Sequence, residues 1–316
     1  MKKVRVGVIG VGYLGQFHAE KYAAIPDTDL VGIADTDTVR ASQIAEKLNT
    51  RAFPDPLHLL GQVDAVSVVV PTVLHHRIAK QFLKKGIHVL LEKPITATLE
   101  QADELIELAT GKKLVLQVGH LERFNPAVTA VKALLKAPRY MSAERSAPFT
   151  IRCTDVNVIL DLMIHDLDIV MDLAGSEPYR VSAAGASVIT QEIDSASARI
   201  VFRSGCVADV TASRVSDEKK RLLRVFDGGA VYTSDYQSQK AVVAHKGGDT
   251  TPELLTRDIS IGRRDTLGEE VRSFVMSVQT GAPPLVSGGE GRRALALAQK
   301  ITENIQKGIT DFVPAA

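Results

Sequence analysis

Two short segments of the sequence combine residue types that could carry out redox chemistry on an alcohol. Asp161 and His165 are four residues apart, so a helix would place both on one face, where the imidazole can accept a proton and the carboxylate can orient it or the substrate. Near the N-terminus, Gly10, Gly12 and Gly15 form the pattern that lets a strand-to-helix turn approach a pyrophosphate. A dinucleotide site and a proton-handling pair together predict a dehydrogenase.

The surroundings of the glycine motif agree with dinucleotide binding. The motif follows a β-branched run and precedes a predicted helix, so that Tyr13 and Leu14 fall in or beside the turn. Asp35 stands 20 residues after Gly15, at the end of the next predicted strand, where a carboxylate can bind ribose hydroxyls. An acidic residue there favours NAD over NADP, because NADP carries a 2′-phosphate at this position. Arg40 could accommodate that phosphate, so NADP remains an alternative. The alternative is an ordinary tight turn, with Asp35 capping the following helix.

Two more motifs end predicted strands at the sheet edge where parallel α/β folds bind ligands. Thr72 follows the third strand and could face the cofactor, with His75 just beyond it; the alternative is a helix N-cap followed by a solvent-facing histidine. Glu92, Lys93 and Pro94 close the fourth strand. Lys93 could donate to a substrate hydroxyl or help to deprotonate it, and the alternative is a surface ion pair. We therefore count Thr72, His75 and Glu92 as candidate cofactor-binding residues and Lys93 as a candidate catalytic residue.

Two other polar segments leave alternatives open. The expected crossover between domains contains Arg123 and Asn125, which could bind sugar hydroxyls or phosphate or could belong to a structural hinge. Asp161, His165 and Asp168 are all possible metal ligands. Because no sulfur ligand or second nearby histidine supports zinc, we predict no metal. A third interpretation turns these polar side chains outward to solvent.

These motifs need a scaffold of alternating strands and helices. The first part of the chain predicts strands at 4–9, 30–34, 65–70, 88–91 and 114–118, with helices at 13–24, 39–48, 76–85 and 99–109. Apolar strands that alternate with amphipathic helices indicate a doubly wound parallel sheet covered on both faces. We expect this α/β domain to comprise residues 1–122.

The pattern changes after about residue 124. A helix at 159–173 and strands at 198–202, 207–213 and 222–226 predict a second α/β domain, residues 123–316, with a largely antiparallel open sheet that has one wet face. Loops are expected at 247–252 and 261–266, followed by a helix at 267–280. The last helix, predicted at 291–306, could pack on either domain.

The composition excludes several classes of protein. The chain has 316 residues and a net charge of +1, which gives no overall basic field for nucleic acid. The apolar run near the N-terminus is too short and too interrupted for a signal peptide or a membrane span. Cys153 and Cys206 lack metal-ligand spacing and are too few for a disulfide framework. We therefore expect a soluble, cytoplasmic protein with no nucleic-acid or membrane partner.

With these motifs in order, the chain resembles the glucose-fructose oxidoreductase, inositol dehydrogenase and MocA (Gfo/Idh/MocA) family over essentially its whole length. The matching features are Gly10 to Gly15 with His18, Pro71-Thr72 with His75, Glu92-Lys93-Pro94, and Asp161 through His165 to Asp168. The resemblance implies an N-terminal Rossmann domain, NAD as cofactor, and Lys93 and His165 acting at the hydroxyl that is oxidised. It also implies a homo-oligomer, a dimer or a tetramer, because the open sheet of the second domain often serves in such contacts. Many relatives carry a small residue between that Asp and His, where this chain has Met163.

Within the family, residues 119–126 and 160–166 look most like those of enzymes that oxidise C3 of UDP-N-acetylglucosamine, toward a diamino sugar of lipid A. That resemblance implies a partner aminotransferase for the product and cationic or backbone partners for the two phosphates, with Arg123, Arg145 and Arg214 as candidates. One alternative is a dehydrogenase of a free polyol or inositol, which needs no phosphate site. Another is a sensor that binds NAD without catalysis.

Overall fold

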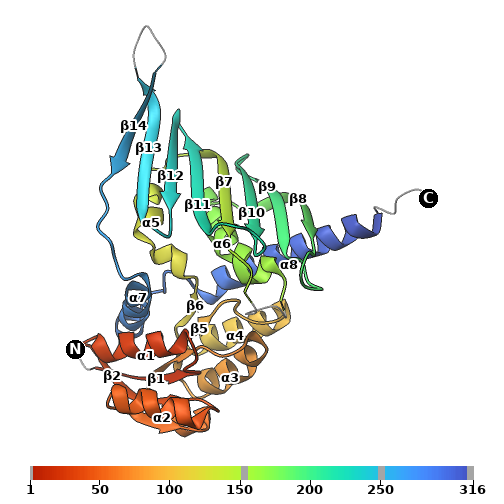
Figure 1. Ribbon diagram of the computed structural model, residues 1–316. Coiled ribbons are helices and arrows are strands. Elements are labelled where there is room, and N and C mark those ends of the chain that lie inside the picture. Colours follow the sequence, from red (N-terminus) through yellow and green to blue (C-terminus); the bar gives the residue numbers. More distant parts are fainter. Residues whose placement is uncertain (1–2, 151–155, 248–252, 312–316) are drawn as a thin grey trace. The chain divides into compact units, whose positions relative to one another are not determined.

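The computed structural model describes residues 3–150, 156–247 and 253–311, with side chains to residue 308. Cys153 and residues 248–252 of an expected loop lie outside this part, whereas Gly247 ends a strand. The chain forms two compact units, one of residues 1–121 with 265–292 and one of residues 122–264 with 293–316. Figure 1 gives the elements of each unit, which are described separately below.

Within the described residues, the first unit contains a six-stranded, fully parallel sheet in the order β3-β2-β1-β4-β5-β6. Its strands are β1 (Val4–Ile9), β2 (Thr28–Ala34), β3 (Arg51–Phe53), β4 (Ala65–Val68), β5 (His88–Glu92) and β6 (Leu116–Gly119). Its helices are α1 (Gly15–Ala24), α2 (Thr38–Lys47), α3 (Thr72–Lys84), α4 (Leu99–Gly111) and α7 (Thr266–Thr280), with a 3₁₀ turn η1 (Pro56–Leu59). The strand order reverses between β1 and β4, which is where such sheets bind ligands at the carboxyl ends of the strands. The predicted doubly wound sheet is confirmed.

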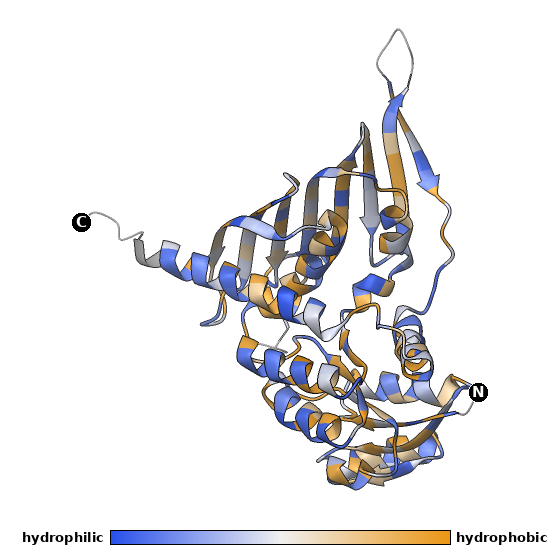
Figure 2. Ribbon diagram, turned by 180° about the vertical axis from the view of Figure 1, so that it is seen from behind, coloured by the Kyte–Doolittle hydropathy of each residue, from blue (hydrophilic) through white to orange (hydrophobic). Residues whose placement is uncertain are grey.

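The parallel strands form because their side chains are apolar on both faces. The neighbouring residues Val8 and Ile9 of β1, which point to opposite faces, are both buried, as are Ala65 and Val66 of β4. The helices carry one apolar stripe each and appear banded in orange and blue in Figure 2. Helix α3 begins at Thr72, four residues earlier than predicted, because Pro71 fixes the entry to the helix and the first turn includes His75.

Helix α7 differs from the domain expectation, which placed every residue after 122 in the second domain. Its buried side chains Val271, Phe274 and Val275 join a core cluster with side chains of α1, α2 and β1. Residues 265–292 therefore group with the first unit. The sequence pattern gave α7 an apolar face without showing which surface would cover it.

Within the described residues, the second unit contains an eight-stranded sheet in the order β14-β13-β12-β11-β7-β10-β9-β8, in which only the β7–β10 pair is parallel. The strands are β7 (Pro138–Ser146), β8 (Pro178–Ala186), β9 (Ser195–Phe202), β10 (Val207–Ser213), β11 (Lys220–Asp227), β12 (Ala230–Asp235), β13 (Lys240–Gly247) and β14 (Glu253–Ile259). Burial alternates along β9 and β10, so one face is covered and the other is wet. The predicted, largely antiparallel open sheet is confirmed.

Helices cover the inner face of this sheet. They are α5 (Pro126–Lys132), α6 (Ile164–Ala174) and α8 (Gly288–Asp311), with a 3₁₀ turn η2 (Leu121–Phe124) before α5. The later turns of α8 place Leu297, Ala298 and Ile301 in the core of this unit. In the described part of the chain, no helix combines the length and the apolar character needed to cross a membrane.

The helix predicted at 159–173 is divided in the structure. A π-helical turn, η3 (Ile159–Met163), precedes α6. Such turns are uncommon and often occur at functional sites, because the wider turn changes the direction of the side chains. Asp161 lies in the π-helical turn and His165 in the first turn of α6.

Candidate functional site

The glycine motif forms a tight turn between β1 and α1. Gly10 has φ +83°, and a Cβ added there would lie 2.2 Å from the Val69 carbonyl oxygen. A Cβ at Gly15 would lie 1.8 Å from the Gly10 oxygen, so the helix can approach the strand only with glycine at this position. By contrast, a Cβ at Gly12 would meet no described atom within 4 Å. Two glycines are therefore needed for packing, and the third leaves the backbone open to a ligand.

Asp35 at the end of β2 is held beside this turn. Its carboxylate accepts hydrogen bonds from the backbone N–H of Val11 at 2.8 Å and of Asp37 at 2.9 Å, and from Arg40 at 3.2 Å. Burial alone would raise the pKa of Asp35, but these hydrogen bonds outweigh it and lower that pKa below its usual value. Asp37, rather than Asp35, caps α2. Asp35 is therefore an ionised acceptor.

A pocket of about 550 Å³ lies over these residues, a volume suited to a small-molecule ligand. Its lining includes Gly10, Gly12, Asp35, Arg40, Pro71 and Leu74. In the same turn, Tyr13 is 67% exposed and Leu14 is 36% exposed. In the described structure, the first turn of α1 contains no acidic residue that would repel a phosphate. This set of open backbone, carboxylate acceptor and helix N-terminus fits a dinucleotide.

The polar residues after β4 are placed differently from one another. Thr72 is the first residue of α3 and is half-buried. The ring of His75 is buried, with Nδ1 2.9 Å from the Pro94 carbonyl oxygen and Nε2 2.8 Å from the Val70 carbonyl oxygen. Burial lowers the pKa of His75 despite these two acceptors. His75 thus holds the turn after β5, and its contact with a cofactor stays a prediction, as does that of Thr72.

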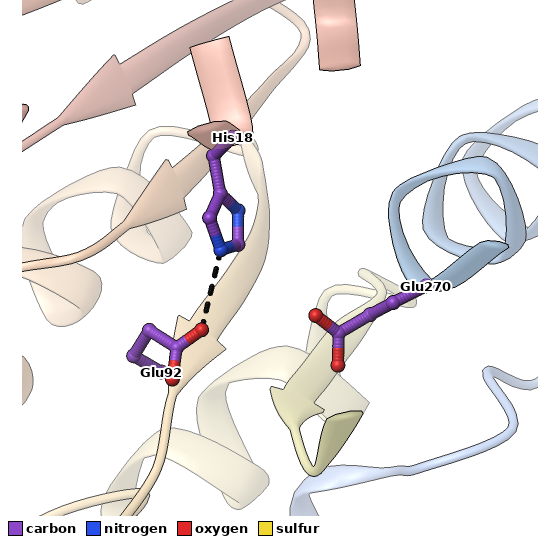
Figure 3. A group of neighbouring side chains, drawn as sticks. All are labelled: His18, Glu92 and Glu270. Atoms are coloured by element: carbon purple, nitrogen blue, oxygen red, sulfur yellow. Dashed lines mark hydrogen bonds and ion pairs between the residues drawn. The ribbon is translucent and has the colours of Figure 1, made fainter. Parts of the chain in front are cut away.

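Glu92 and Lys93 lie at the end of β5. Glu92 Oε1 accepts a hydrogen bond from His18 Nε2 at 3.2 Å, drawn in Figure 3, and Oε2 accepts the backbone N–H of Lys93 at 3.1 Å. A Cβ at Gly119 would lie 2.8 Å from Glu92 Oε1, so glycine on β6 makes room for the carboxylate. Burial would raise the pKa of Glu92, but the hydrogen bond and charge of His18 and the charge of Lys93 leave it lowered. In place of the surface ion pair that was the alternative, the structure has a buried carboxylate that accepts the backbone N–H of the half-buried Lys93.

In the second unit, Asp161 lies in η3 and His165 lies in the first turn of α6. Both are half-buried, whereas Met163 and Ile164 between them are fully buried. Met163 belongs to the core cluster, so its size affects the packing beneath the polar pair. The rival metal set is not brought together: among the described residues, the one group whose ligand atoms gather is His18, Glu92 and Glu270.

The arginines considered for phosphate binding are engaged in internal ion pairs. Arg123 Nε lies 3.1 Å from Asp168 Oδ2, Arg145 Nε lies 2.6 Å from Asp166 Oδ2, and Arg214 Nε lies 2.8 Å from Asp194 Oδ1. Each of the three arginines is at most 6% exposed. Removing a guanidinium from such a pair to bind phosphate would leave a buried carboxylate alone, at a cost of several kcal/mol. Their substrate contacts remain predictions.

Asn125 also has a local structural role. Its Oδ1 accepts the Ala127 N–H at 3.0 Å and so caps α5, while Nδ2 donates to Glu122 Oε2 and to the Tyr236 carbonyl, each at 3.0 Å. These contacts correspond to the hinge alternative, and binding of substrate by Asn125 stays a prediction.

Sequence reasoning missed a basic pocket in the second unit. This pocket of about 490 Å³ is lined by Lys219, Lys220, Arg221 and Arg263, with Asp235 as its acidic residue. The Asp235 carboxylate already accepts backbone N–H groups of its own turn. Burial and the charge of Arg145 lower the pKa of Arg221, against the opposing charges of Glu122 and Asp166, and Arg221 Nη1 lies 3.6 Å from Glu122 Oε1. The Lys-Lys-Arg run is visible in the sequence, but such runs usually mark a solvated surface.

Comparisons with known proteins identify relatives along the chain. Residues 4–120 match the model of an oxidoreductase family with an NAD-binding Rossmann fold, and residues 128–231 match the Gfo/Idh/MocA C-terminal domain. The UDP-N-acetylglucosamine 3-dehydrogenase of Acidithiobacillus ferrooxidans is 42% identical over 305 residues, 95% of this chain and 97% of that protein. The myo-inositol 2-dehydrogenase of Thermotoga maritima is 28% identical over 96% of this chain and 97% of its own length. A solved structure of the Acidithiobacillus enzyme superposes with a TM-score of 0.91 at 39% identity, covering 97% of this chain and 99% of that one.

Proposed function

Because this chain belongs to the Gfo/Idh/MocA family of NAD-binding oxidoreductases, we propose that it oxidises C3 of the sugar in UDP-N-acetylglucosamine. The observation that carries the proposal is the 42% identity to a UDP-N-acetylglucosamine 3-dehydrogenase across nearly the whole of both chains. The protein is an NAD-dependent sugar dehydrogenase, an oxidoreductase acting on CH–OH groups. The proposal adds the identity of the nucleotide sugar and the position of the hydroxyl that is oxidised.

The proposed reaction needs groups that hold NAD and groups that remove a proton. NAD, when bound, supplies the acceptor for the hydride. Gly10 and Gly12 would hold its pyrophosphate by backbone contact and Asp35 its ribose hydroxyls. We assign removal of the hydroxyl proton to His165, oriented by Asp161 and assisted by Lys93, since an imidazole titrates near neutral pH.

A nucleotide sugar also needs a site for its two phosphates. The basic pocket supports the proposal, because its guanidinium and ammonium groups can form charge-assisted hydrogen bonds with phosphate oxygens. Arg221→Ala should raise the KM for UDP-N-acetylglucosamine by about tenfold, since one such bond contributes about 1.5–3 kcal/mol. Arg257→Ala, which removes an exposed arginine on β14, is the matched control. An equal effect of both substitutions would argue against a diphosphate in this pocket.

The test of the function is NADH formation from NAD with a panel of UDP-sugars and free polyols. The assay includes a coupled aminotransferase, since a keto product that is not removed would limit the forward reaction. Turnover of UDP-N-acetylglucosamine, with competition by UDP, is the expected result. Turnover of polyols alone would show that the substrate is a free polyol, as for an inositol dehydrogenase. NAD binding without turnover across the panel would instead favour a sensor.

The biological setting follows from this substrate. We propose that the keto product passes to an aminotransferase on the way to a diamino sugar of lipid A. We also propose that the enzyme works as a homo-oligomer in the cytoplasm, in keeping with the free and buried Cys206. Isolation of a complex with an aminotransferase, or accumulation of the keto sugar when that enzyme is deleted, would test the pathway.

A further inference from the structure

A cluster of three buried ionisable side chains in the first unit is not used by the reaction described above. His18 of α1, Glu92 of β5 and Glu270 of α7 each bring one polar atom within 4.8 Å of the others. All three are buried. Figure 3 shows the Glu270 carboxyl group pointing from α7 toward the hydrogen-bonded pair formed by His18 and Glu92.

The three members differ in how their polar atoms are satisfied. His18 Nδ1 lies 3.3 Å from Ser67 Oγ, and Glu92 has His18 and the Lys93 backbone N–H as donors. In the described structure, neither carboxyl oxygen of Glu270 has a hydrogen-bond partner, and Glu270 is 0% exposed. An isolated carboxylate in such a place is so unfavourable that the group takes up a proton instead.

The charges around the cluster favour an ionised Glu92 and a neutral Glu270. Burial, together with the charge of Glu92, raises the pKa of Glu270 well above its usual value. Glu92 has a lowered pKa, because His18 and Lys93 favour its ionised form over the effect of burial. His75 also lies within electrostatic reach of Glu92, and Tyr22 within reach of Glu270. The cluster therefore separates two carboxyl groups by environment, as acid and base pairs in active sites do.

A divalent cation is the rival occupant of the cluster. It would require Glu270 to be ionised, and it would lie close to the positive charge of Lys93, which already lowers the pKa of Glu92. A proton removes the charge of Glu270 without adding that repulsion. The observations therefore favour the proton.

We propose that Glu270 holds a proton at neutral pH, so that the cluster of His18, Glu92 and Glu270 carries a single negative charge on Glu92, which positions Lys93 through its backbone N–H. Glu270 and Glu92 are positioning residues, because they act through Lys93. The proton on Glu270 is independent of the substrate, whereas the link to Lys93 rests on the proposed function. If Glu270 were also ionised, a second negative charge would compete with Glu92 for His18.

The proton on Glu270 is tested by unfolding the full chain in urea between pH 5 and pH 8. A carboxyl group whose pKa is raised by folding stabilises the protein below its unfolded pKa, and that stability is lost as the pH rises toward the folded pKa. Glu270→Gln, which mimics the neutral acid, removes this dependence. The unfolding constant of the unsubstituted protein should therefore rise relative to that of the variant by up to about tenfold per pH unit.

Glu269→Gln is the matched control, because Glu269 lies next in the chain but is partly exposed and pairs with Arg272. It should leave the pH dependence parallel to that of the unsubstituted protein. Parallel curves for Glu270→Gln would overturn the proposal. So would a stoichiometric divalent metal in the purified protein whose removal by EDTA destabilises it, since a bound cation needs the ionised acid.

The link to Lys93 is tested by hydrogen–deuterium exchange and by kinetics. Glu92→Ala should raise the exchange rate of the Lys93 amide by at least about tenfold, because it loses a carboxylate acceptor. It should also lower kcat, because Lys93 is no longer held in place, and Glu92→Gln should restore part of the amide protection and part of kcat. Unchanged exchange would remove the positioning role. If Glu92→Ala raises the exchange rate of the Lys93 amide but the unsubstituted protein oxidises no sugar, the proposed function is wrong, whereas the positioning of Lys93 by Glu92 is supported.

Discussion

Lys93 is the residue whose local surroundings most directly suggest a chemical role. Its backbone N–H is fixed by Glu92, and the chain leaves it through Pro94, whose carbonyl oxygen contacts the buried His75. A half-buried ammonium group on a rigid strand end can donate a hydrogen bond to a substrate with little loss of side-chain entropy. The sequence motif alone did not distinguish this arrangement from a surface ion pair.

Lys93→Met should abolish turnover while leaving cofactor binding nearly intact. The methionine fills a similar volume but cannot donate or transfer a proton, so kcat should fall by about two to four orders of magnitude. The Kd for NAD, measured by isothermal titration calorimetry because the chain has no tryptophan, should change by less than about threefold. Substantial turnover by this variant would contradict the role of Lys93.

At the scale of elements, two glycines of the β1–α1 turn have different roles: Gly15 is needed for packing of the helix on the strand, and Gly12 leaves the backbone open to a ligand. Gly15→Ala should destabilise the protein by about 3 kcal/mol or more, because its Cβ would overlap the Gly10 carbonyl oxygen and force the helix from the strand. Gly12→Ala meets no described atom and should leave the stability within about 1 kcal/mol, while it weakens NAD binding.

Urea unfolding and NAD titration of the two glycine variants distinguish these effects. The prediction fails if the two substitutions destabilise the fold equally, or if Gly12→Ala binds NAD with its original affinity.

The segment before β9 is held by a buried carboxylate. Asp194 accepts the backbone N–H groups of Val188, Ile189 and Thr190 and pairs with Arg214. Burial alone would raise the pKa of Asp194, but these hydrogen bonds lower it far below its usual value. The ionised group therefore stabilises the fold above the unfolded pKa of about 3.9, and this contribution is lost as the pH falls toward the folded pKa.

Asp194→Asn should cost about 3 kcal/mol at pH 7, because it leaves the guanidinium of Arg214 buried without its charge partner. The difference in unfolding free energy between the two proteins should shrink progressively below about pH 4. Chemical unfolding at pH 7, 5 and 3 measures it. A difference that is constant across this range would show that the charge of Asp194 is not responsible.

The elements that the sequence predicted are those with one dominant pattern. Apolar runs such as 4–9 and 88–91 are buried on both faces, so they are recognisable without knowing their neighbours. Strand β7 (Pro138–Ser146) was missed because its outer face is wet and its sequence alternates small, polar and charged residues. The division of η3 from α6 depends on a backbone hydrogen-bond register that side-chain periodicity does not encode.

For the site, predictability depends on distance along the chain. The turn with Gly10 and Asp35, and the strand end with Glu92, are local motifs whose chemistry follows from the fold they begin. Glu270 lies far from Glu92 in the sequence, and only the packing of α7 on the first unit brings them together. Likewise, the sequence contains both Arg145 and Asp166, but it does not show that the two side chains form a buried ion pair.

At the scale of the whole molecule, the wet face of the eight-stranded sheet is the surface that an oligomer would cover. Phe226 on β11 points away from the core residues Leu223 and Val225, is 39% exposed, and lies 5.3 Å from the ring of Tyr140 on the neighbouring strand. Flanking groups such as Arg224 are polar, so a covered aromatic centre with a polar rim would resemble a specific protein interface.

We therefore predict a homo-oligomer that Phe226→Arg dissociates, because like charges would face each other across a symmetric contact. Light scattering coupled to size exclusion should show a dimer or tetramer at micromolar concentration for the unsubstituted protein and a monomer for Phe226→Arg. Phe226→Leu, which keeps an apolar side chain, is the control and should retain the assembly. The urea midpoints of both variants at low protein concentration should agree, since Phe226 contributes little to the core of its own sheet. An unsubstituted monomer, or an assembly that tolerates arginine at this position, would place the contact elsewhere or remove it.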